Sequence, residues 1–172
     1  MTATLVLGGA RSGKSAFAQR AAEGAAIGAR PVLIATGQAF DDEMAERIAR
    51  HQADRGDSWM TVEAPLDLSA ALAALPADGV AVVDCLTLWL SNLMLADQDV
   101  AAATADLLDV VFACEARLWL VSNEVGLGIV PETPLGRRFR DEAGRLHQDL
   151  ARAVDEVFFI AAGLPLRLKP AA

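Results

Sequence analysis

A short apolar run near the start of the chain leads directly into a glycine-rich loop, and this junction limits the possible folds more than any other feature. The run is Thr4–Leu7, and residues 8–15 read Gly-Gly-Ala-Arg-Ser-Gly-Lys-Ser. They match the pattern G-x-x-x-x-G-K-[ST], in which backbone N–H groups turn inward on phosphate oxygens and the next helix adds the positive end of its dipole. The junction therefore predicts a strand, a phosphate-binding loop (P-loop) and a helix beginning at Lys14.

The side chains of this loop predict how a nucleotide would be held. Lys14 is expected to reach the outer phosphates, and the Ser15 hydroxyl is expected to ligate Mg²⁺. The strand before the loop and the helix after it argue against a glycine turn that matches by chance. The whole predicted phosphate-binding set is Gly8, Gly9, Ala10, Arg11, Ser12, Gly13, Lys14 and Ser15.

A carboxylate at the end of another strand commonly works with such a loop. Val80–Asp84 supplies one, because four apolar residues precede Asp84 and parallel strands present their carboxyl ends to ligands. Asp84 is therefore predicted to hold the metal. The alternative is an N-cap for the helix that begins at Leu86, which Asp also favours. An acid that follows a buried strand requires a compensating partner, and this favours the metal role.

Beyond the loop, the chain alternates short β-rich runs with longer helical patterns. Such alternation predicts an α/β fold of the P-loop NTPase (RecA-like) type, a mostly parallel sheet with helices on both faces. The tail, Val157–Ala161 and Leu164–Leu168 around a tight turn at Gly163, predicts a short antiparallel edge. The other predicted strands are Pro31–Ala35, Trp59–Val62 and Leu118–Ser122. The predicted helices are Asp41–Asp54, Leu66–Leu75, Leu86–Leu95 and Val100–Arg117. One more helix is predicted from apolar residues that share a single face: Phe139, Ala143, Leu146, Leu150 and Ala153.

Length, charge and composition limit the number of domains, the binding partners and the cellular location that we expect. At 172 residues the chain fits one domain, residues 1–172, and a net charge of −8 argues against broad binding to nucleic acid or anionic membranes. No apolar run reaches the roughly eighteen residues of a membrane span, and no basic leader precedes the first strand. Cys85 and Cys114 are too few for a disulfide framework or a four-ligand zinc site. We expect a cytoplasmic protein with reduced thiols.

Two features are not explained by nucleotide binding alone. His51 follows Met44 by seven positions and Ile48 by three, so the three share one helix face. Taken alone, a histidine on an apolar face is more often a core residue than a catalyst. The second feature is the stretch Ser122–Pro131, where a strand ends in polar residues and glycines, as loops that carry function commonly do.

Taken together, these segments resemble the bifunctional adenosylcobinamide kinase/adenosylcobinamide-phosphate guanylyltransferases of cobalamin biosynthesis. The likeness runs from residue 4 to Lys169, and the stretch Asn-Glu-Val-Gly-x-Gly-Ile-Val-Pro at 123–131 is its most specific part. The other segments, in family order, are residues 8–15, Ile34–Thr36, Asp41–Met44, Arg47 and Ile48 with His51, Val83–Thr87 and Phe139–Arg145.

The resemblance implies two successive reactions. The aminopropanol hydroxyl of adenosylcobinamide is phosphorylated with ATP or GTP, and GMP is then transferred from GTP to adenosylcobinamide phosphate, giving adenosylcobinamide-GDP and pyrophosphate. It implies that the guanylylated intermediate forms on His51, so this histidine is then expected to be catalytic and not part of the core. Lys14 is expected to assist catalysis. The resemblance also implies homotrimers. An imidazole nitrogen suits this role, since it can attack the α-phosphorus of GTP and split one displacement into two.

Further site residues follow only from the resemblance. Ala35, Thr36 and Gly37 after one strand and Glu63 after another would line the guanine nucleotide site, together with Gln52, Ala53, Asp54 and Arg55. Thr36 and Glu63 fit ordinary turn and surface chemistry equally well. Family members commonly carry Asn where this chain has His147, so His147 is expected to lie on a helix surface without a catalytic role. Glu124 and Arg140 are candidates for supporting or substrate-contacting groups, but Arg140, among Arg137, Arg138 and Arg145, fits a solvated helix face as well, and their roles stay open.

Two other functions remain open from the residues. A P-loop kinase of another small metabolite would keep the loop and Asp84 but would give His51 no covalent role. A GTP-dependent switch is less well supported, because the chain has no Asn-Lys-x-Asp motif for reading guanine.

Overall fold

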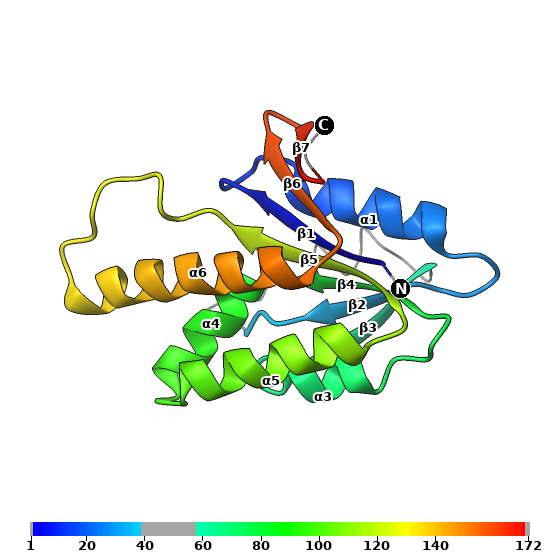
Figure 1. The fold of residues 1–172 in the computed structure, drawn as a ribbon, viewed down its shortest axis with the longest axis horizontal. Coiled ribbons are helices and arrows are strands. Elements are labelled where there is room, and N and C mark those ends of the chain that lie inside the picture. Colours follow the sequence, from blue (N-terminus) through cyan, green and yellow to red (C-terminus); the bar gives the residue numbers. More distant parts are fainter. Residues whose placement is uncertain (1, 39–57, 171–172) are drawn as a thin grey trace.

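One mostly parallel sheet forms the centre of the molecule. The computed structural model describes residues 2–38 and 58–170, so the predicted helix Asp41–Asp54 lies outside the described residues. The strand order is β3-β2-β4-β5-β1-β6-β7, and only β7 runs antiparallel to its neighbour (Figure 1). The strands are β1 (Thr2–Gly8), β2 (Val32–Ala35), β3 (Met60–Glu63), β4 (Val80–Asp84), β5 (Arg117–Asn123), β6 (Glu156–Ala161) and β7 (Leu164–Lys169).

Helices cover both faces of this sheet, as predicted. α1 (Lys14–Ala25) lies on one face, and the other described helices lie on the opposite face (Figure 1). These are α3 (Leu68–Ala73), α4 (Leu86–Leu95), α5 (Val100–Ala113) and α6 (Pro134–Ala153). The two layers produce two hydrophobic clusters, one against α1 and a larger one against α3 to α6.

The central strands are apolar along their whole length because both of their faces are buried. In β1, Leu5 and Leu7 point into the larger cluster, while Val6 points toward α1. Val80–Val83 in β4 are likewise buried. A parallel strand covered on both faces reads as a continuous apolar run, and this is why the runs in the sequence located these strands correctly.

Three helices differ from their predicted bounds. α3 is shorter, Leu68–Ala73 instead of Leu66–Leu75. α5 ends at Ala113 rather than continuing to Arg117, because Cys114 is extended and the Arg117 N–H donates to Gly79 O at the start of β5. α6 begins earlier than its apolar pattern indicated: Thr133 caps it by accepting from the Gly136 N–H. Ala153, expected on the buried face of this helix, is exposed at its end.

The C-terminal hairpin completes one edge of the sheet, as predicted. β6 pairs in parallel with β1, and β7 returns antiparallel to β6. The turn between them uses Ala162 and Gly163, whose φ angles of 52° and 80° are both positive. Two consecutive positive φ angles fit the twist of a two-residue hairpin turn. This turn meets the phosphate loop, because the Gly163 N–H donates to Ser12 O at 2.8 Å.

Thr36 joins the end of β2 to the end of β4. Its side chain is fully buried, and its Oγ1 accepts from the Cys85 N–H at 2.9 Å and donates to Cys85 O at 2.7 Å. The Thr36 carbonyl accepts from Asn92 Nδ2 of α4 at 2.7 Å. Thr36 therefore fixes the carboxyl ends of two neighbouring strands and the start of a helix.

Thr36→Val is expected to destabilise the protein by about 2 kcal/mol, because the Cys85 N–H would stay buried without a partner while the side-chain volume is conserved. Urea unfolding followed by circular dichroism measures this. Thr4→Val is the matched control: Thr4 is equally buried but makes one long bond to Glu156, so we expect a loss of about 1 kcal/mol or less. Equal losses in the two variants would contradict the role given to Thr36.

Candidate active site

The phosphate loop connects β1 to α1 with its backbone held from both sides. The Glu124 N–H at the end of β5 donates to Gly8 O at 3.0 Å, and the Gly163 N–H donates to Ser12 O at 2.8 Å. Gly13 is the N-cap of α1, with φ of 95°. Because no side chain caps this helix, its first N–H groups stay available for an anion.

Lys14 lies at the base of this loop. Its side chain is buried, and Nζ donates to Gly9 O at 3.2 Å. A buried ammonium needs partners, and phosphate oxygens above the loop would supply stronger ones than a single carbonyl. Ser15, partly exposed in the first turn of α1, lies one residue further along. The loop, Lys14 and Ser15 therefore lie together at the start of α1, where the sequence predicts that an anion binds.

Gly8 is required by its surroundings. A Cβ at this position would lie 2.5 Å from Ser12 Oγ and 2.6 Å from Ile160 O, both shorter than real contacts. Ser12 Oγ is itself buried, and the described residues offer it no hydrogen-bond partner. The loop thus packs tightly against the neighbouring strand and leaves one hydroxyl unsatisfied.

The predicted carboxylates share one row across the sheet edge. Ala35 pairs with Glu63 on one side and with Asp84 on the other, so the three residues end their strands at the same level. Glu63 is exposed, and Asp84 is half-buried. Asp84 does not cap the following helix, because Cys85 holds the N-cap position. Within the described part of the chain, no side chain forms an ion pair with its carboxylate.

These residues fit Mg²⁺ better than a metal enclosed by protein. Within residues 2–38 and 58–170, no three His, Cys, Asp or Glu side chains gather around a common point. Mg²⁺ in nucleotide sites is usually held by one or two protein oxygens, with phosphates and waters completing the shell. The Asp84 carboxylate and the Ser15 hydroxyl are oxygen ligands of that kind.

Other predicted residues are less informative or lie outside the described structure. His51, Gln52, Ala53, Asp54 and Arg55 fall outside the described residues. The hydroxyl of Thr36 is used by Cys85, so it is not free for a nucleotide. Burial, and after it the Asp84 charge, raises the pKa of the Cys85 thiol. Cys85 is therefore a protonated thiol at neutral pH, and it donates or accepts a bond with Thr87 Oγ1.

The expectation that His147 lies on the helix surface is wrong. The residue is only 7% exposed, and its Nε2 lies 2.7 Å from Ser122 Oγ of β5. Its Nδ1 lies 3.7 Å from Glu124 Oε2. The signal was present in the sequence, since position 147 follows Ala143 by four and precedes Leu150 by three, which places it on their buried face.

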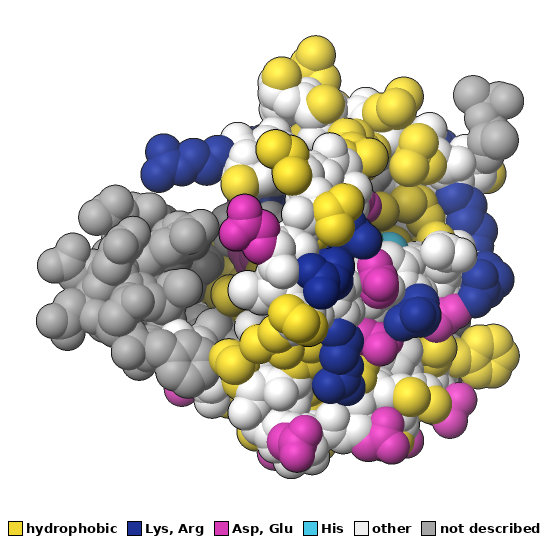
Figure 2. All heavy atoms as spheres, turned by 90° about the vertical axis from the view of Figure 1, so that its left-hand side faces the viewer, with side chains coloured by type: hydrophobic (Ala, Val, Ile, Leu, Met, Phe, Trp, Pro, Cys, Tyr) yellow, Lys and Arg dark blue, Asp and Glu magenta, His cyan; other side chains and the backbone are white. Residues whose placement is uncertain are grey.

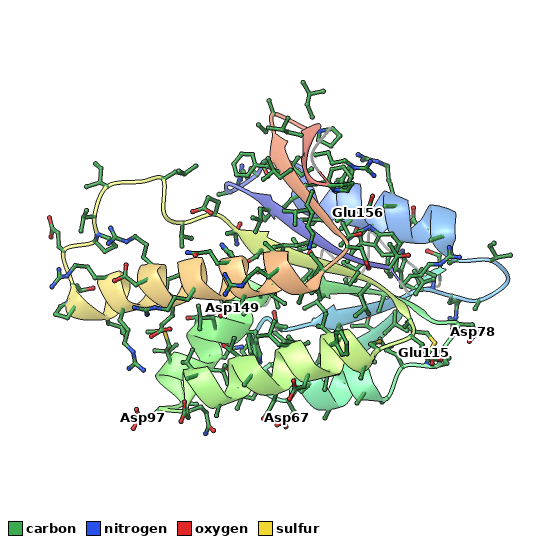
Figure 3. All side chains as sticks on the ribbon, viewed as in Figure 1. Asp67, Asp78, Asp97, Glu115, Asp149 and Glu156 are labelled. Atoms are coloured by element: carbon green, nitrogen blue, oxygen red, sulfur yellow. The ribbon has the colours of Figure 1, made fainter. Side chains whose placement is uncertain are left out.

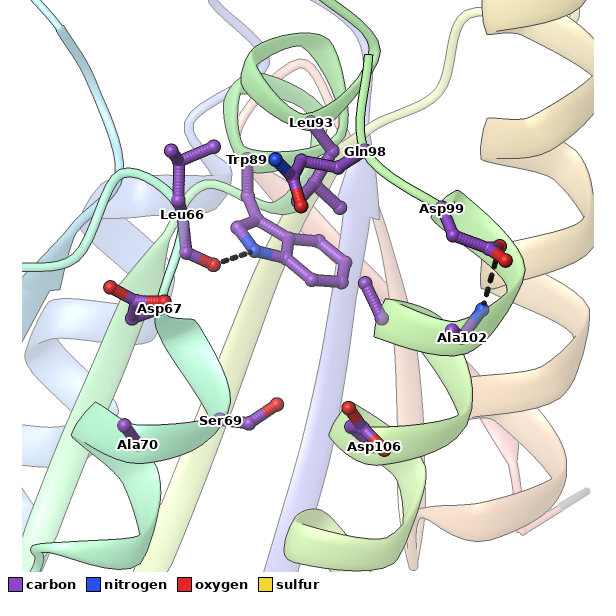
Figure 4. A pocket seen from close by; sticks show the side chains of 11 residues that line it. Leu66, Asp67, Ser69, Ala70, Trp89, Leu93, Gln98, Asp99, Ala102 and Asp106 are labelled. Atoms are coloured by element: carbon purple, nitrogen blue, oxygen red, sulfur yellow. Dashed lines mark hydrogen bonds between the residues drawn. The ribbon is translucent and has the colours of Figure 1, made fainter. Parts of the chain in front are cut away.

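A cavity of about 470 Å³ opens between α3, α4 and α5 (Figure 4). Asp67, Asp99 and Asp106 lie around it, and Trp89 forms part of its wall while donating to Leu66 O. None of its described lining residues belongs to the phosphate loop. The loop, and not this cavity, therefore defines the candidate site.

Charge is distributed without a dominant sign around the site. Figure 2 views the side of the molecule where the parallel strands end, and Lys and Arg side chains there alternate with Asp, Glu and hydrophobic groups. Other acids lie elsewhere: Asp78 and Glu115, just before β4 and β5, are at the opposite edge of the sheet (Figure 3).

No helix in the described part of the chain is long and apolar enough to cross a membrane.

The fold and the loop together define a P-loop NTPase-like protein with a phosphate site at the carboxyl edge of its sheet. Two solved structures share this fold. The P4 protein of bacteriophage phi6, in complex with ADP, aligns with a TM-score of 0.53 and 17% identity over 95% of this chain and 52% of its own. A Pyrococcus horikoshii OT3 protein aligns with a TM-score of 0.55 and 10% identity over 99% and 87%.

The chain belongs to the cobinamide kinase/cobinamide phosphate guanyltransferase family, whose model matches residues 4–168. Its relatives include the bifunctional adenosylcobalamin biosynthesis protein CobP of Pseudomonas aeruginosa, 49% identical over 96% of both chains. The corresponding CobU proteins of Salmonella typhimurium and Escherichia coli are 42% and 39% identical over 96% of this chain and 98% of theirs. The chain is therefore a bifunctional kinase and guanylyltransferase.

The buried His147 gives the protein a pH-dependent stability. Burial lowers the pKa of His147 below 6.5, and the Glu124 carboxylate offsets part of this lowering. As pH falls below 6.5, the unfolded chain takes up a proton that the folded protein binds less readily. The contribution is thus complete above pH 6.5 and is lost as pH falls through the lower pKa of the folded state.

Comparison of the wild type with His147→Asn tests this. Between about pH 8 and about pH 5, the wild type should lose more free energy of unfolding than the variant, because only the wild type carries this histidine. Urea unfolding at each pH measures the difference. Parallel curves for the two proteins would show that His147 is not responsible.

Proposed function

We propose that the chain phosphorylates adenosylcobinamide with ATP or GTP and then transfers GMP from GTP to adenosylcobinamide phosphate, with a histidine carrying the guanylyl group in between. The observation that carries the proposal is the phosphate loop beside Asp84 in a chain that matches the family from residue 4 to 168. Both reactions displace a group at phosphorus from a nucleoside triphosphate. One anion-binding loop can therefore serve both.

The loop would act on the triphosphate by position and charge. Its N–H groups and Lys14 would hold the phosphates in place, and negative charge that develops on the leaving phosphate would face Lys14. Ser15 and Asp84 would hold Mg²⁺, which supplies additional positive charge to the phosphates when bound. Asp84 ends β4, and Ser15 lies in the first turn of α1, after the loop that follows β1.

His51 is proposed to form the covalent intermediate. A ring nitrogen would attack the α-phosphorus of GTP, the bond from the α-phosphorus to the bridging oxygen would break, and pyrophosphate would leave with that electron pair. An oxygen of adenosylcobinamide phosphate would then attack the same phosphorus and release the imidazole. The family resemblance of the segment Asp41–Asp54 supports this role.

The guanosine part of GTP is proposed to lie over the ends of β2 and β3. Ala35, Thr36, Gly37 and Glu63 would line this site, with Gln52, Ala53, Asp54 and Arg55. The shared row of Glu63, Ala35 and Asp84 supports the proposal, because the metal-side carboxylate and the nucleoside contacts would then be neighbours. Thr36 would contribute through its position, since its hydroxyl is bonded to Cys85.

The proposed oligomeric state, location and substrates are those that the family resemblance implies. We propose a homotrimer of single-domain chains in the cytoplasm, acting on adenosylcobinamide and its phosphate with GTP or ATP and not on nucleic acid. Two free cysteines, one of them buried, support a reducing compartment. The net charge of −8 supports the exclusion of nucleic acid as a partner.

The covalent step can be tested with GTP labelled at the α-phosphate. The wild type should acquire an acid-labile, alkali-stable label that adenosylcobinamide phosphate removes, while His51→Ala should acquire none and still phosphorylate adenosylcobinamide. Gel autoradiography and chromatography of the corrinoid product measure both outcomes. An active wild-type kinase that never becomes labelled would instead support the alternative, a kinase of small metabolites without a covalent intermediate.

The metal role of Asp84 predicts a changed magnesium requirement. Asp84→Asn keeps the shape of the side chain but removes its charge, so the Mg²⁺ concentration for half-maximal kinase activity should rise by about tenfold or more. A magnesium titration of initial rates measures this. Asp78→Asn, at the opposite edge of the sheet, is the matched control and should titrate as the wild type does.

A further inference from the structure

One carboxylate beside the phosphate loop has no part in the proposed steps. Glu124 follows β5, the strand that separates Asp84 on β4 from the loop strand β1. Asn123 pairs with Gly8, and the Glu124 N–H donates to Gly8 O at 3.0 Å. Glu124 therefore lies at the same edge as the loop, on the strand next to it.

The carboxylate of Glu124 is held in place on two sides. Oε1 accepts from the Gly126 N–H at 2.6 Å, and Oε2 lies 3.7 Å from His147 Nδ1. A Cβ at position 126 would lie 2.8 Å from Oε1, so this tight turn suits glycine. The Glu124 side chain is still 23% exposed. It is thus fixed in orientation and accessible to a ligand.

His147 is in turn held by Ser122. In the neutral ring the nearby carboxylate favours the proton on Nδ1, so Nε2 accepts from the Ser122 hydroxyl at 2.7 Å. Ser122 is fully buried and cannot reach a substrate. Ser122, His147 and Glu124 are therefore not a catalytic triad with a serine nucleophile. The accessible member of the group is the Glu124 carboxylate.

No basic side chain neutralises this carboxylate within the described structure. The only ion-pair partner of Glu124 there is His147, and no Lys or Arg of residues 2–38 or 58–170 lies within ion-pair distance. Arg140, about two turns before His147 on α6, pairs with Asp141 instead. A fixed and unneutralised carboxylate at a phosphate site can accept a proton.

We propose that Glu124 is the general base of the kinase step and that His147 is its positioning residue. The acceptor hydroxyl oxygen forms a bond to the γ-phosphorus, and its proton passes to the Glu124 carboxylate. The bond from the γ-phosphorus to the bridging oxygen breaks, and the nucleoside diphosphate leaves with that electron pair. Atoms and charge balance without any further reactant.

This role, which rests on the proposed function, separates the two reactions. The first acceptor is a neutral hydroxyl, which must lose a proton as it attacks. The second acceptor is a phosphate, which is already ionised near pH 7 and needs no base. Removing the base should therefore impair phosphorylation and leave guanylyl transfer nearly unchanged, although both reactions use the same loop.

Glu124→Gln is the direct test, with Glu132→Gln as the matched control. Glu132 is an exposed acid in the same loop, so the control removes the same charge. The kinase kcat with adenosylcobinamide and ATP should fall by about 10²-fold or more in Glu124→Gln, because proton transfer is lost. Transfer of GMP from α-labelled GTP to purified adenosylcobinamide phosphate should stay within about threefold of the wild type, and Glu132→Gln should retain both activities.

The alternative outcomes have distinct meanings. Equal losses of both reactions in Glu124→Gln would show that Glu124 only shapes the loop, and an unchanged kinase rate would show that it is not the base. Either result overturns this inference. A wild-type protein that phosphorylates adenosylcobinamide but never transfers GMP would contradict the proposed function instead.

The positioning role of His147 has its own test. His147→Leu, which keeps an apolar side chain in the buried position but cannot donate to Glu124, should lower the kinase kcat while leaving KM for adenosylcobinamide and the guanylyl transfer unchanged, because only the orientation of Glu124 is lost. Combined with Glu124→Gln it should lower kcat no further, since both changes act through one carboxylate. Losses that multiply in the double variant would show that His147 acts independently of Glu124.

Discussion

The close approach of backbone to backbone at Gly8 is the constraint on which the site depends. The space that a side chain would fill at this position is taken by Ser12 Oγ and Ile160 O. β1 can therefore turn into the loop while staying paired with β5 and β6 on its two sides. The loop is supported from both neighbours, and the N–H groups at the start of α1 are not occupied by a capping side chain.

The sheet places groups from distant parts of the sequence along one edge. Glu63, Ala35 and Asp84 end neighbouring strands at one level, and Asn123 and Gly8 end the next two. A row of this kind lets one nucleotide contact several strands at once, which is the usual advantage of an open α/β sheet. It also brings two carboxylates, Asp84 at the end of β4 and Glu124 just after β5, to neighbouring strand ends beside the loop.

Much of this arrangement could be predicted from local patterns. The loop motif, the apolar strands and the C-terminal hairpin depend on near neighbours in sequence, so their residues located them correctly. The end of α5 was misplaced because the pairing of Arg117 with Gly79 is a tertiary contact that overrides helical propensity. The surface position expected for His147 was wrong, although its spacing from Ala143 and Leu150 indicated burial. The nearness of Glu124 to Gly8 follows only from strand order, which no local pattern contains.

The bond between Gly163 and Ser12 links the hairpin turn to a loop near the other end of the sequence. During synthesis the ribosome makes the loop, β4 and Asp84 long before the turn that supports them. A nascent chain therefore carries the residues for binding a triphosphate without the contact that fixes their geometry. The loop is therefore held on its Ser12 side only after β6 and β7 have joined the sheet.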